Sequence, residues 1–205
     1  MARSLQSVVK MSRREGYALH PKAHKALLKR PSPPGQQQRN MRAKTSQYSL
    51  QLREKQKAKR MYGLLEKQFS NMMKEASKMQ GQAGEHLLVN LEKRLDNTVY
   101  RAGYAPSRQA ARQLVSHGHF TLNGKRVDIP SIRVKIGDEI VLRTKSQSNE
   151  YFKKLDDVSP APSIIPDWLS VNRKKFDIKL VLICLKNICY AEIVVDSVTF
   201  LATFN

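Results

Sequence analysis

The chain has 205 residues, of which 37 are Lys or Arg and 17 are Asp or Glu, so its formal net charge is +20 at pH 7. Its hydrophobic content of 40% is enough for a packed core. This charge favours a polyanionic partner, nucleic acid first and an anionic membrane surface second, and argues against a protein whose basic residues serve only solubility.

The positive charge is concentrated toward the N-terminus. Residues 1–80 hold 19 basic and 4 acidic side chains, residues 81–145 hold 11 and 6, and residues 146–205 hold 7 of each. We therefore expect the first 145 residues to make most of the contacts with an anion.

The cysteines and the apolar segments indicate a cytoplasmic protein. Cys184 and Cys189 are too few for a disulfide framework or a four-cysteine zinc site, so reduced thiols are expected. No apolar core of a signal peptide follows the first residues. Residues 180–205 are rather apolar, but Lys186, Glu192 and Asp196 interrupt them, and a membrane span tolerates such charges badly. We expect no membrane partner.

Residues 1–44 are basic and show little periodicity. The segment RPSPPGQQQRN (30–40) contains three prolines and a glycine, which prevent a regular helix. We expect a basic extended arm that a partner orders, with a disordered tail as the alternative in isolation. The last basic side chains of this arm are candidate nucleic-acid contacts: Arg39, Arg42 and Lys44.

Residues 45–92 are predicted to form a helical domain. Thr45 or Ser46 can serve as the N-cap, and Gly63 is expected to loosen the helix locally. One apolar stripe is expected to face the core: Ala58, Met61, Leu65, Phe69, Met72 and Ala76. Five cations crowd the preceding turns: Arg53, Lys55, Lys57, Lys59 and Arg60. Because few acids lie nearby in the sequence, we favour phosphate contact over a merely solvated face.

Residues 93–145 are predicted to form a compact helix-helix-β module. After a break at Gly81 and Gly84, a helix ends near Gly103. Its apolar residues at helical spacing are Leu88, Leu91, Leu95 and Val99. Ser107 is the expected N-cap of a helix from Arg108 to about His117. Asn123-Gly124 is the preferred type I′ hairpin turn, and Gly137-Asp138 marks a second turn.

The helix that begins at Arg108 is expected to have two distinct faces. At about 100° per residue, its polar side carries Arg108, Gln109, Arg112, Gln113 and Ser116. Its opposite side carries Ala110, Ala111 and Leu114, and should dock on a core. Guanidinium groups make forked, charge-assisted bonds that fit phosphate. Further cations crowd the same passage, and we expect no core to bury them: Arg94, Arg101, His117, His119 and Lys125.

The C-terminal part is less regular. Residues 146–167 are predicted to be a linker or surface loop, and Trp168 and Phe176 are the expected anchors of the segment that follows. Residues 180–205 have high β propensity without a clear turn signal, and no fold is assigned to them.

No catalytic or metal-binding motif is present. Nucleotide-binding glycine loops, a nucleophile elbow and an HExxH pair are all missing, and the carboxylates are scattered, so neither an enzyme nor a cofactor is expected. His117 and His119 could suggest a metal site. Because no acid or cysteine ligand accompanies them, an RNA-facing or helix-capping role is favoured.

Residues 94–142 closely resemble the RNA-binding module of the S-four family of small-subunit ribosomal proteins. The matching motifs are RLDN-x-VYR, SR-x-x-ARQLV-x-HGH, the NG turn, PS and GDEI. Similarity to the bacterial type continues upstream in YSLQLREKQKAKRMYGLLEKQF (48–69) and RPSPPGQ (30–36), and downstream in PDWLSVN (166–172).

The resemblance implies an α+β fold, in which the small module is inserted into a helical N-terminal domain and residues 146–205 return to that domain. It implies a structural constituent of the small subunit that binds rRNA of the 5′ domain, nucleates assembly, and contributes to accuracy near the mRNA entry path beside neighbouring ribosomal proteins. In some bacteria mRNA is a further partner. The residues implied to face rRNA are Arg53, Lys55, Lys57, Lys59, Arg94, Arg108, Arg112, His117 and His119; Arg60, Arg101, Gln109 and Lys125 complete the candidate set.

Two departures from the family pattern are expected to matter. Many members carry an N-terminal four-cysteine zinc site, whose ligand positions align here with Val9, Ser12, His20 and Lys25, so we expect no zinc. Residues 180–205 do not match the family's usual end, which leaves open a divergent tail or an altered reading frame.

Two other functions compete with this interpretation. The same module occurs as an accessory in RNA-modifying enzymes, but too few residues lie outside it here for a catalytic domain. A free RNA-binding repressor or stress factor is the second alternative. The expected location is a bacterial cytoplasm, with an organelle-encoded ribosome as the alternative.

Overall fold

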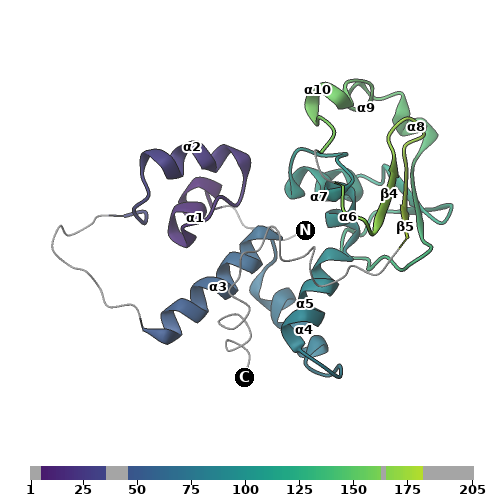
Figure 1. Ribbon diagram of the computed structural model, residues 1–205. Helices are drawn as coiled ribbons and strands as arrows, with labels where there is room; N and C mark the ends of the chain where they lie inside the picture. Colours follow the sequence, from purple (N-terminus) through teal and green to yellow (C-terminus); the bar gives the residue numbers. More distant parts are fainter. Residues whose placement is uncertain (1–5, 36–45, 163–164, 182–205) are drawn as a thin grey trace. The chain divides into compact units, whose positions relative to one another are not determined.

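A computed structural model describes residues 6–35, 46–162 and 165–181 (Figure 1). The described residues divide into two compact units, with the boundary between Leu87 and Leu88. Among the described residues, no helix is long and apolar enough to cross a membrane.

The described part of the first unit is helical. It contains α1 (Val8–Glu15), α2 (Pro21–Lys29), α3 (Gln47–Met61), α4 (Glu66–Ala76) and the start of α5 (Ala83–Glu92). The expectation of an extended arm over residues 1–44 is therefore wrong for residues 8–29. Helices of eight and nine residues offer too few repeats for periodicity to reveal them.

Local capping chemistry explains where these helices begin and end. His20 accepts a hydrogen bond from the Lys22 amide through Nδ1, with proline at the first helical position of α2. Ser46 caps α3 by accepting from the Ser49 amide at 3.2 Å, as predicted. Gly63 adopts a φ of 64° and separates α3 from α4, so it ends a helix instead of loosening one.

The predicted apolar stripe largely forms the core of the first unit. Leu65 is half-buried, and the other five members are buried: Ala58, Met61, Phe69, Met72 and Ala76. The stripe continues across the break at Gly63 because both helices turn the same kind of face inward.

The second unit combines helices with one antiparallel sheet. It contains the end of α5, α6 (Leu95–Arg101) and α7 (Arg108–Ser116), followed by β1 (Phe120–Leu122), β2 (Lys125–Val127) and β3 (Glu139–Leu142). Asn123 and Gly124 both have positive φ, as the predicted type I′ turn requires. The mixed α+β class predicted for the chain is confirmed.

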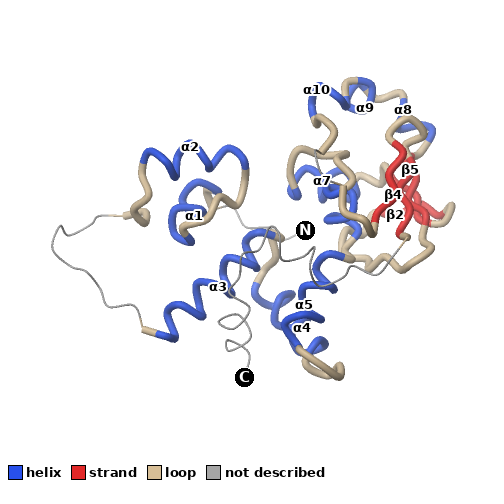
Figure 2. The backbone as a smooth tube through the Cα atoms, in the orientation of Figure 1, coloured by secondary structure: helices blue, strands red, loops and turns tan. Residues whose placement is uncertain are grey.

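The C-terminal segment joins the sheet of the module. Strands β4 (Leu169–Asn172) and β5 (Asp177–Leu180) extend it in the order β2-β1-β3-β5-β4. The strands are the red parts of the tube in Figure 2. Ile140 of β3 pairs with Ile178 of β5, both fully buried. The expectation that this segment returns to the helical domain is therefore wrong for residues 169–180, and residues 182–205 lie outside the described part.

Three short helices lie in and just before the first half of the predicted linker: α8 (Thr144–Gln147), α9 (Glu150–Lys153) and α10 (Leu155–Val158). Phe152 of α9 is buried against Phe120 of β1, with ring centroids 6.4 Å apart. Trp168 is buried, as expected of an anchor, whereas Phe176 is half-buried.

Candidate nucleic-acid interface

Helix α7 begins and packs for identifiable reasons. Ser107 caps it by accepting from the Ala110 amide at 3.2 Å, as predicted. Its fully buried residues are Ala111 and Val115, whereas Ala110 and Leu114 are only half-buried. The core-facing side is thus centred on Ala111 and Val115, and it is rotated from the predicted side of Ala110, Ala111 and Leu114.

This rotation places the two arginines of α7 beside the buried side. Arg108 and Arg112 are both half-buried, while Gln109 and Gln113 are exposed. Arg108 donates from Nε to Asn97 Oδ1 at 2.9 Å, and its guanidinium lies 4.6 Å from the centre of the Tyr100 ring. The polar face of α7 therefore combines an ordered arginine, Arg108, with a half-buried Arg112 and two exposed amides.

Burial and charge also act on Arg112. Burial lowers the pKa of its guanidinium, Asp96 opposes that shift, and Arg94 adds to it. An arginine remains charged despite such a shift. The desolvated cation therefore gains strongly from an anion that approaches its exposed side.

Arg94 differs from its neighbours because it is buried, with 4% of its surface exposed. Its Nε and Nη2 donate to the two carboxylate oxygens of Asp96 at 3.0 and 2.7 Å. The expectation that a core could not bury any of these cations is wrong here, since Asp96 supplies the compensating charge inside the fold. We therefore leave Arg94 out of the proposed interface.

Arg101 is also committed to a carboxylate. It donates from Nε and Nη2 to Glu92 at 3.1 and 2.8 Å, and its side chain is mostly buried. The pair is bidentate, which fixes the plane of the guanidinium.

The two histidines meet just beyond α7. His117 is exposed, and its ring centroid is 5.9 Å from that of His119. His119 Nδ1 lies 3.0 Å from Ser146 Oγ, and burial, His117 and Arg143 together lower the pKa of His119. Among the described residues, no group of three or more His, Cys, Asp or Glu could hold a metal ion.

Two arginines that the sequence reading missed stand beside these histidines. Arg143 donates from Nη1 to the Gly118 carbonyl at 3.1 Å. The Arg126 guanidinium lies so close to Gly118 that a Cβ there would be 2.7 Å from its Nε, and Arg126 follows the exposed Lys125 on β2. Gly118 has a φ of 70°, and this glycine directly after a predicted helix was the available signal.

The basic cluster of α3 has acidic partners that the sequence did not bring close. Glu15 of α1 pairs with Arg53 and Arg60, and Glu66 of α4 pairs with Lys55 at 2.7 Å and Lys59 at 2.6 Å. The expectation that few acids lie near these cations is therefore wrong, because the fold brings Glu15 and Glu66 beside them. These ion pairs weaken the case for all of them as phosphate contacts.

The pKa shifts of the two acids reflect their surroundings. Burial raises the pKa of Glu15 although Arg53 and Arg60 oppose the shift, whereas hydrogen bonds from Lys55 and Lys59 lower the pKa of Glu66. Lys57 is buried, 3.5 Å from Glu54 and 5.0 Å from the centre of the Tyr17 ring. Lys57 therefore connects α3 to Tyr17, which lies between α1 and α2.

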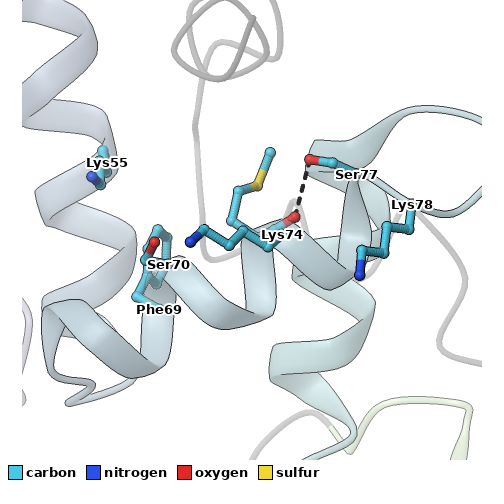
Figure 3. A pocket seen from close by; sticks show the side chains of 7 residues that line it. Lys55, Phe69, Ser70, Lys74, Ser77 and Lys78 are labelled. Atoms are coloured by element: carbon cyan, nitrogen blue, oxygen red, sulfur yellow. Dashed lines mark hydrogen bonds between the residues drawn. The ribbon is translucent and has the colours of Figure 1, made fainter.

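Other cations of the first unit are more accessible. An open pocket lies between α3 and α4, and Figure 3 shows its lining residues: Lys55, Phe69, Ser70, Met73, Lys74, Ser77 and Lys78. Ser77 Oγ donates to the Met73 carbonyl at 3.0 Å, drawn dashed in Figure 3. Lys74 and Lys78 are exposed and make no ion pair with any residue that the structure describes. Arg39, Arg42 and Lys44 lie outside the described residues.

Two models of known protein families together match residues 3–140. Residues 3–92 match the family described as ribosomal protein S4/S9 N-terminal domain, and residues 93–140 match the S4 domain. The protein named small ribosomal subunit protein uS4 from Chlorobaculum tepidum is 51% identical over 174 residues, covering 84% of this chain and 85% of that protein. The chain belongs to the uS4 family.

A second relative supports the same assignment. The uS4 protein of Clostridioides difficile is 50% identical over 187 residues, which cover 88% of this chain and 89% of that protein. The resemblance found in the sequence is confirmed, and the family is one of structural ribosomal proteins. Within this uS4 chain, the matched S4 domain contains α6, α7, β1, β2 and the first half of β3.

In this uS4 chain, the positions aligned with a zinc site take part in ordinary hydrogen bonds. Ser12 Oγ accepts from the Leu19 amide at 3.2 Å, and His20 caps α2. The pKa of His20 is lowered, first by burial and second by the positive charge of Lys22. Val9 and Lys25 offer no ligand of the kind that binds zinc.

Proposed function

We propose that this chain is a structural constituent of the small ribosomal subunit that binds small-subunit rRNA directly. The finer proposal is that it binds the 5′ domain early and nucleates its assembly. In the assembled subunit it contributes to translational accuracy near the mRNA entry path, beside neighbouring ribosomal proteins. Membership of the uS4 family supports the coarse statement, and the basic chain supports an RNA partner.

The observation that carries the proposal is the polar face of α7. Arg108 and Arg112 stand one helical turn apart, held at the edge of the core, with Gln109 and Gln113 exposed alongside. Ordered guanidinium groups suit phosphate, and exposed amides suit hydrogen bonds to sugar or base edges. The surface just beyond this helix adds three further cationic or titratable groups: His117, Lys125 and Arg126.

The ion pairs divide the cations of the first unit into those that have an acidic partner and those that have none among the described residues. Lys55, Lys59, Arg53 and Arg60 are neutralised in part by acids, whereas Lys74 and Lys78 have no such partner among the described residues. We propose that the α4 lysines add electrostatic affinity there, and that the α3 cations contribute less than the sequence suggests. We retain Arg39, Arg42 and Lys44 as proposed contacts on their charge alone.

The test is binding of the full, tag-free chain to separate fragments of small-subunit rRNA. We expect tight binding to a fragment that contains the 5′ domain, and binding weaker by at least an order of magnitude to a fragment of equal length from another domain, since specific binding exceeds non-specific binding by such factors or more. Equal affinity for all fragments would contradict the finer proposal.

A free RNA-binding repressor or stress factor remains the alternative function for the same module. Sedimentation of a cell lysate distinguishes the two. A constituent of the subunit travels with small-subunit particles, whereas a free repressor stays in the light fractions.

A further inference from the structure

A network of buried polar side chains lies directly behind the arginines of the second unit. Glu92 at the end of α5 and Asn97 in α6 are only 1% and 2% exposed. Asn97 Nδ2 donates to Glu92 Oε2 at 2.6 Å and to the Glu92 carbonyl at 3.2 Å. These bonds fix the amide so that its oxygen faces Arg108, whose Nε donates to it at 2.9 Å.

The same carboxylate orders a second arginine. Arg101 donates to both oxygens of Glu92, while the Arg108 guanidinium is held against the Tyr100 ring. Arg101 and Arg108 are therefore joined through Glu92 and Asn97 into one hydrogen-bonded group, and both remain partly exposed. Neither guanidinium can rotate without breaking a bond to this group.

A carboxylate close to an RNA-binding face weakens binding, because it repels phosphates. It can also strengthen binding, because it holds the arginine side chains in place before RNA arrives. A long arginine loses rotamer freedom when it binds, and this loss is smaller if the free protein already holds the side chain in place. We propose that Glu92 and Asn97 are positioning residues, which hold Arg101 and Arg108 in the orientation in which they meet RNA phosphates. This inference rests on the proposed rRNA-binding function.

The sign of the effect of Glu92→Gln tests the inference. Glutamine keeps the shape of glutamate and removes its negative charge, so a purely electrostatic role predicts tighter RNA binding. Positioning predicts weaker binding, by about two- to tenfold, the factor that corresponds to ordering one long side chain on association. The matched control is Asp128→Asn, an exposed carboxylate of the same unit, for which unchanged or slightly tighter binding is expected.

A second variant, Asn97→Leu, separates positioning from direct contact without a change of charge. We expect a similar loss of affinity, because the arginines must then lose their rotamer freedom when they bind. The slope of log affinity against log salt should not change, because the arginines still reach the phosphates. Arg108→Ala, in contrast, should flatten that slope by somewhat less than about one unit. If Asn97→Leu, once folded, binds as tightly as the parent chain, its role is only structural and the inference is overturned.

The probe is an rRNA fragment that contains the 5′ domain, and binding is compared at a temperature at which each variant has the circular dichroism spectrum of the parent. If neither variant reaches that spectrum, the variant to measure is Tyr100→Leu, which removes the half-buried ring against which the Arg108 guanidinium is held. The same loss of RNA affinity is expected, and unchanged affinity would contradict the positioning inference. Failure of the parent chain to bind contradicts the proposed function. A parent that binds, together with equal or tighter binding by Glu92→Gln, overturns the positioning inference alone.

Discussion

Arg94 and Arg101 both form bidentate pairs with a carboxylate, yet they differ in exposure. Arg94 and its partner Asp96 are both buried, whereas Arg101 keeps part of its surface at the solvent while Glu92 is buried. Arg94 therefore has a structural role, whereas the exposed part of Arg101 can also contribute to RNA binding. The residue type and its place in the sequence do not distinguish the two.

Arg94→Ala should destabilise the second unit by about 3–5 kcal/mol, because it leaves the buried carboxylate of Asp96 without its partner. Urea unfolding followed by circular dichroism measures this loss. The control is Lys125→Ala on the exposed surface of β2, which should change stability by no more than about 0.5 kcal/mol. Equal stability of the two variants would contradict the structural role of Arg94.

The stability of the second unit should fall as the pH falls below about 6.5, in part because of His119. Its pKa is lowered in the folded state by burial, His117 and Arg143, so the unfolded chain binds the proton more readily. The contribution is therefore fully present above the unfolded pKa and is lost as the pH falls through the folded pKa. Thermal melts from pH 8 to pH 5 should show a shallower decline for His119→Gln, and an identical decline would show that His119 does not contribute.

At the scale of elements, α7 shows how the buried side of a helix controls its functional side. Ala111 and Val115 dock on the core, so Arg108 and Arg112 stand at the edge of the packed surface and not opposite it. This position lets Asn97 hold Arg108 in place, and it partly desolvates Arg112.

Val115→Asp should unfold the second unit, since it places an unpaired charge at a fully buried position, with a loss above about 4 kcal/mol. Leu114→Asp, one residue away on the half-buried side, should cost clearly less. Thermal melts of both variants provide the comparison. A larger loss for Leu114→Asp would restore the orientation of α7 that the sequence alone suggested.

The two C-terminal strands should stabilise the sheet that they join. Trp168 is buried just before β4, and β5 pairs with β3. Trp168→Ala should therefore cost about 3–5 kcal/mol. Amide hydrogen exchange should show faster exchange in β3 as well as in β5. Loss of protection confined to the helices of the first unit would contradict the placement of this segment.

At the scale of the whole molecule, features set by neighbouring residues could be predicted and those set by distant partners could not. The caps at Ser46 and Ser107 and the Asn123-Gly124 turn follow from local chemistry. The pairing of Arg53 and Arg60 with Glu15 joins residues 38 and 45 positions apart, which no local pattern reveals. The joining of β5 to β3 was hidden for the same reason.

In the candidate site, too, the features set by neighbouring residues could be predicted, and those set by distant partners could not. The passage that carries Arg108 and Arg112 was recognised from its motifs, because cations at helical spacing are a local pattern. The burial of Arg94 and the contributions of Arg126 and Arg143 around Gly118 depend on how α6, α7 and the sheet pack. Their roles became visible only in three dimensions.

The salt dependence of rRNA affinity tests the central claim, that the polar face of α7 meets RNA phosphates. The comparison is between the parent chain, the Arg108→Ala/Arg112→Ala double variant and Lys153→Ala, an exposed lysine of α9, all checked for folding by thermal melts. We expect each α7 arginine to contribute roughly 1–3 kcal/mol to binding and somewhat less than about one unit to the log–log salt slope, with Lys153→Ala close to the parent. A double variant that is folded and binds a 5′-domain fragment with unchanged affinity and slope would contradict the claim and place the RNA-binding face elsewhere.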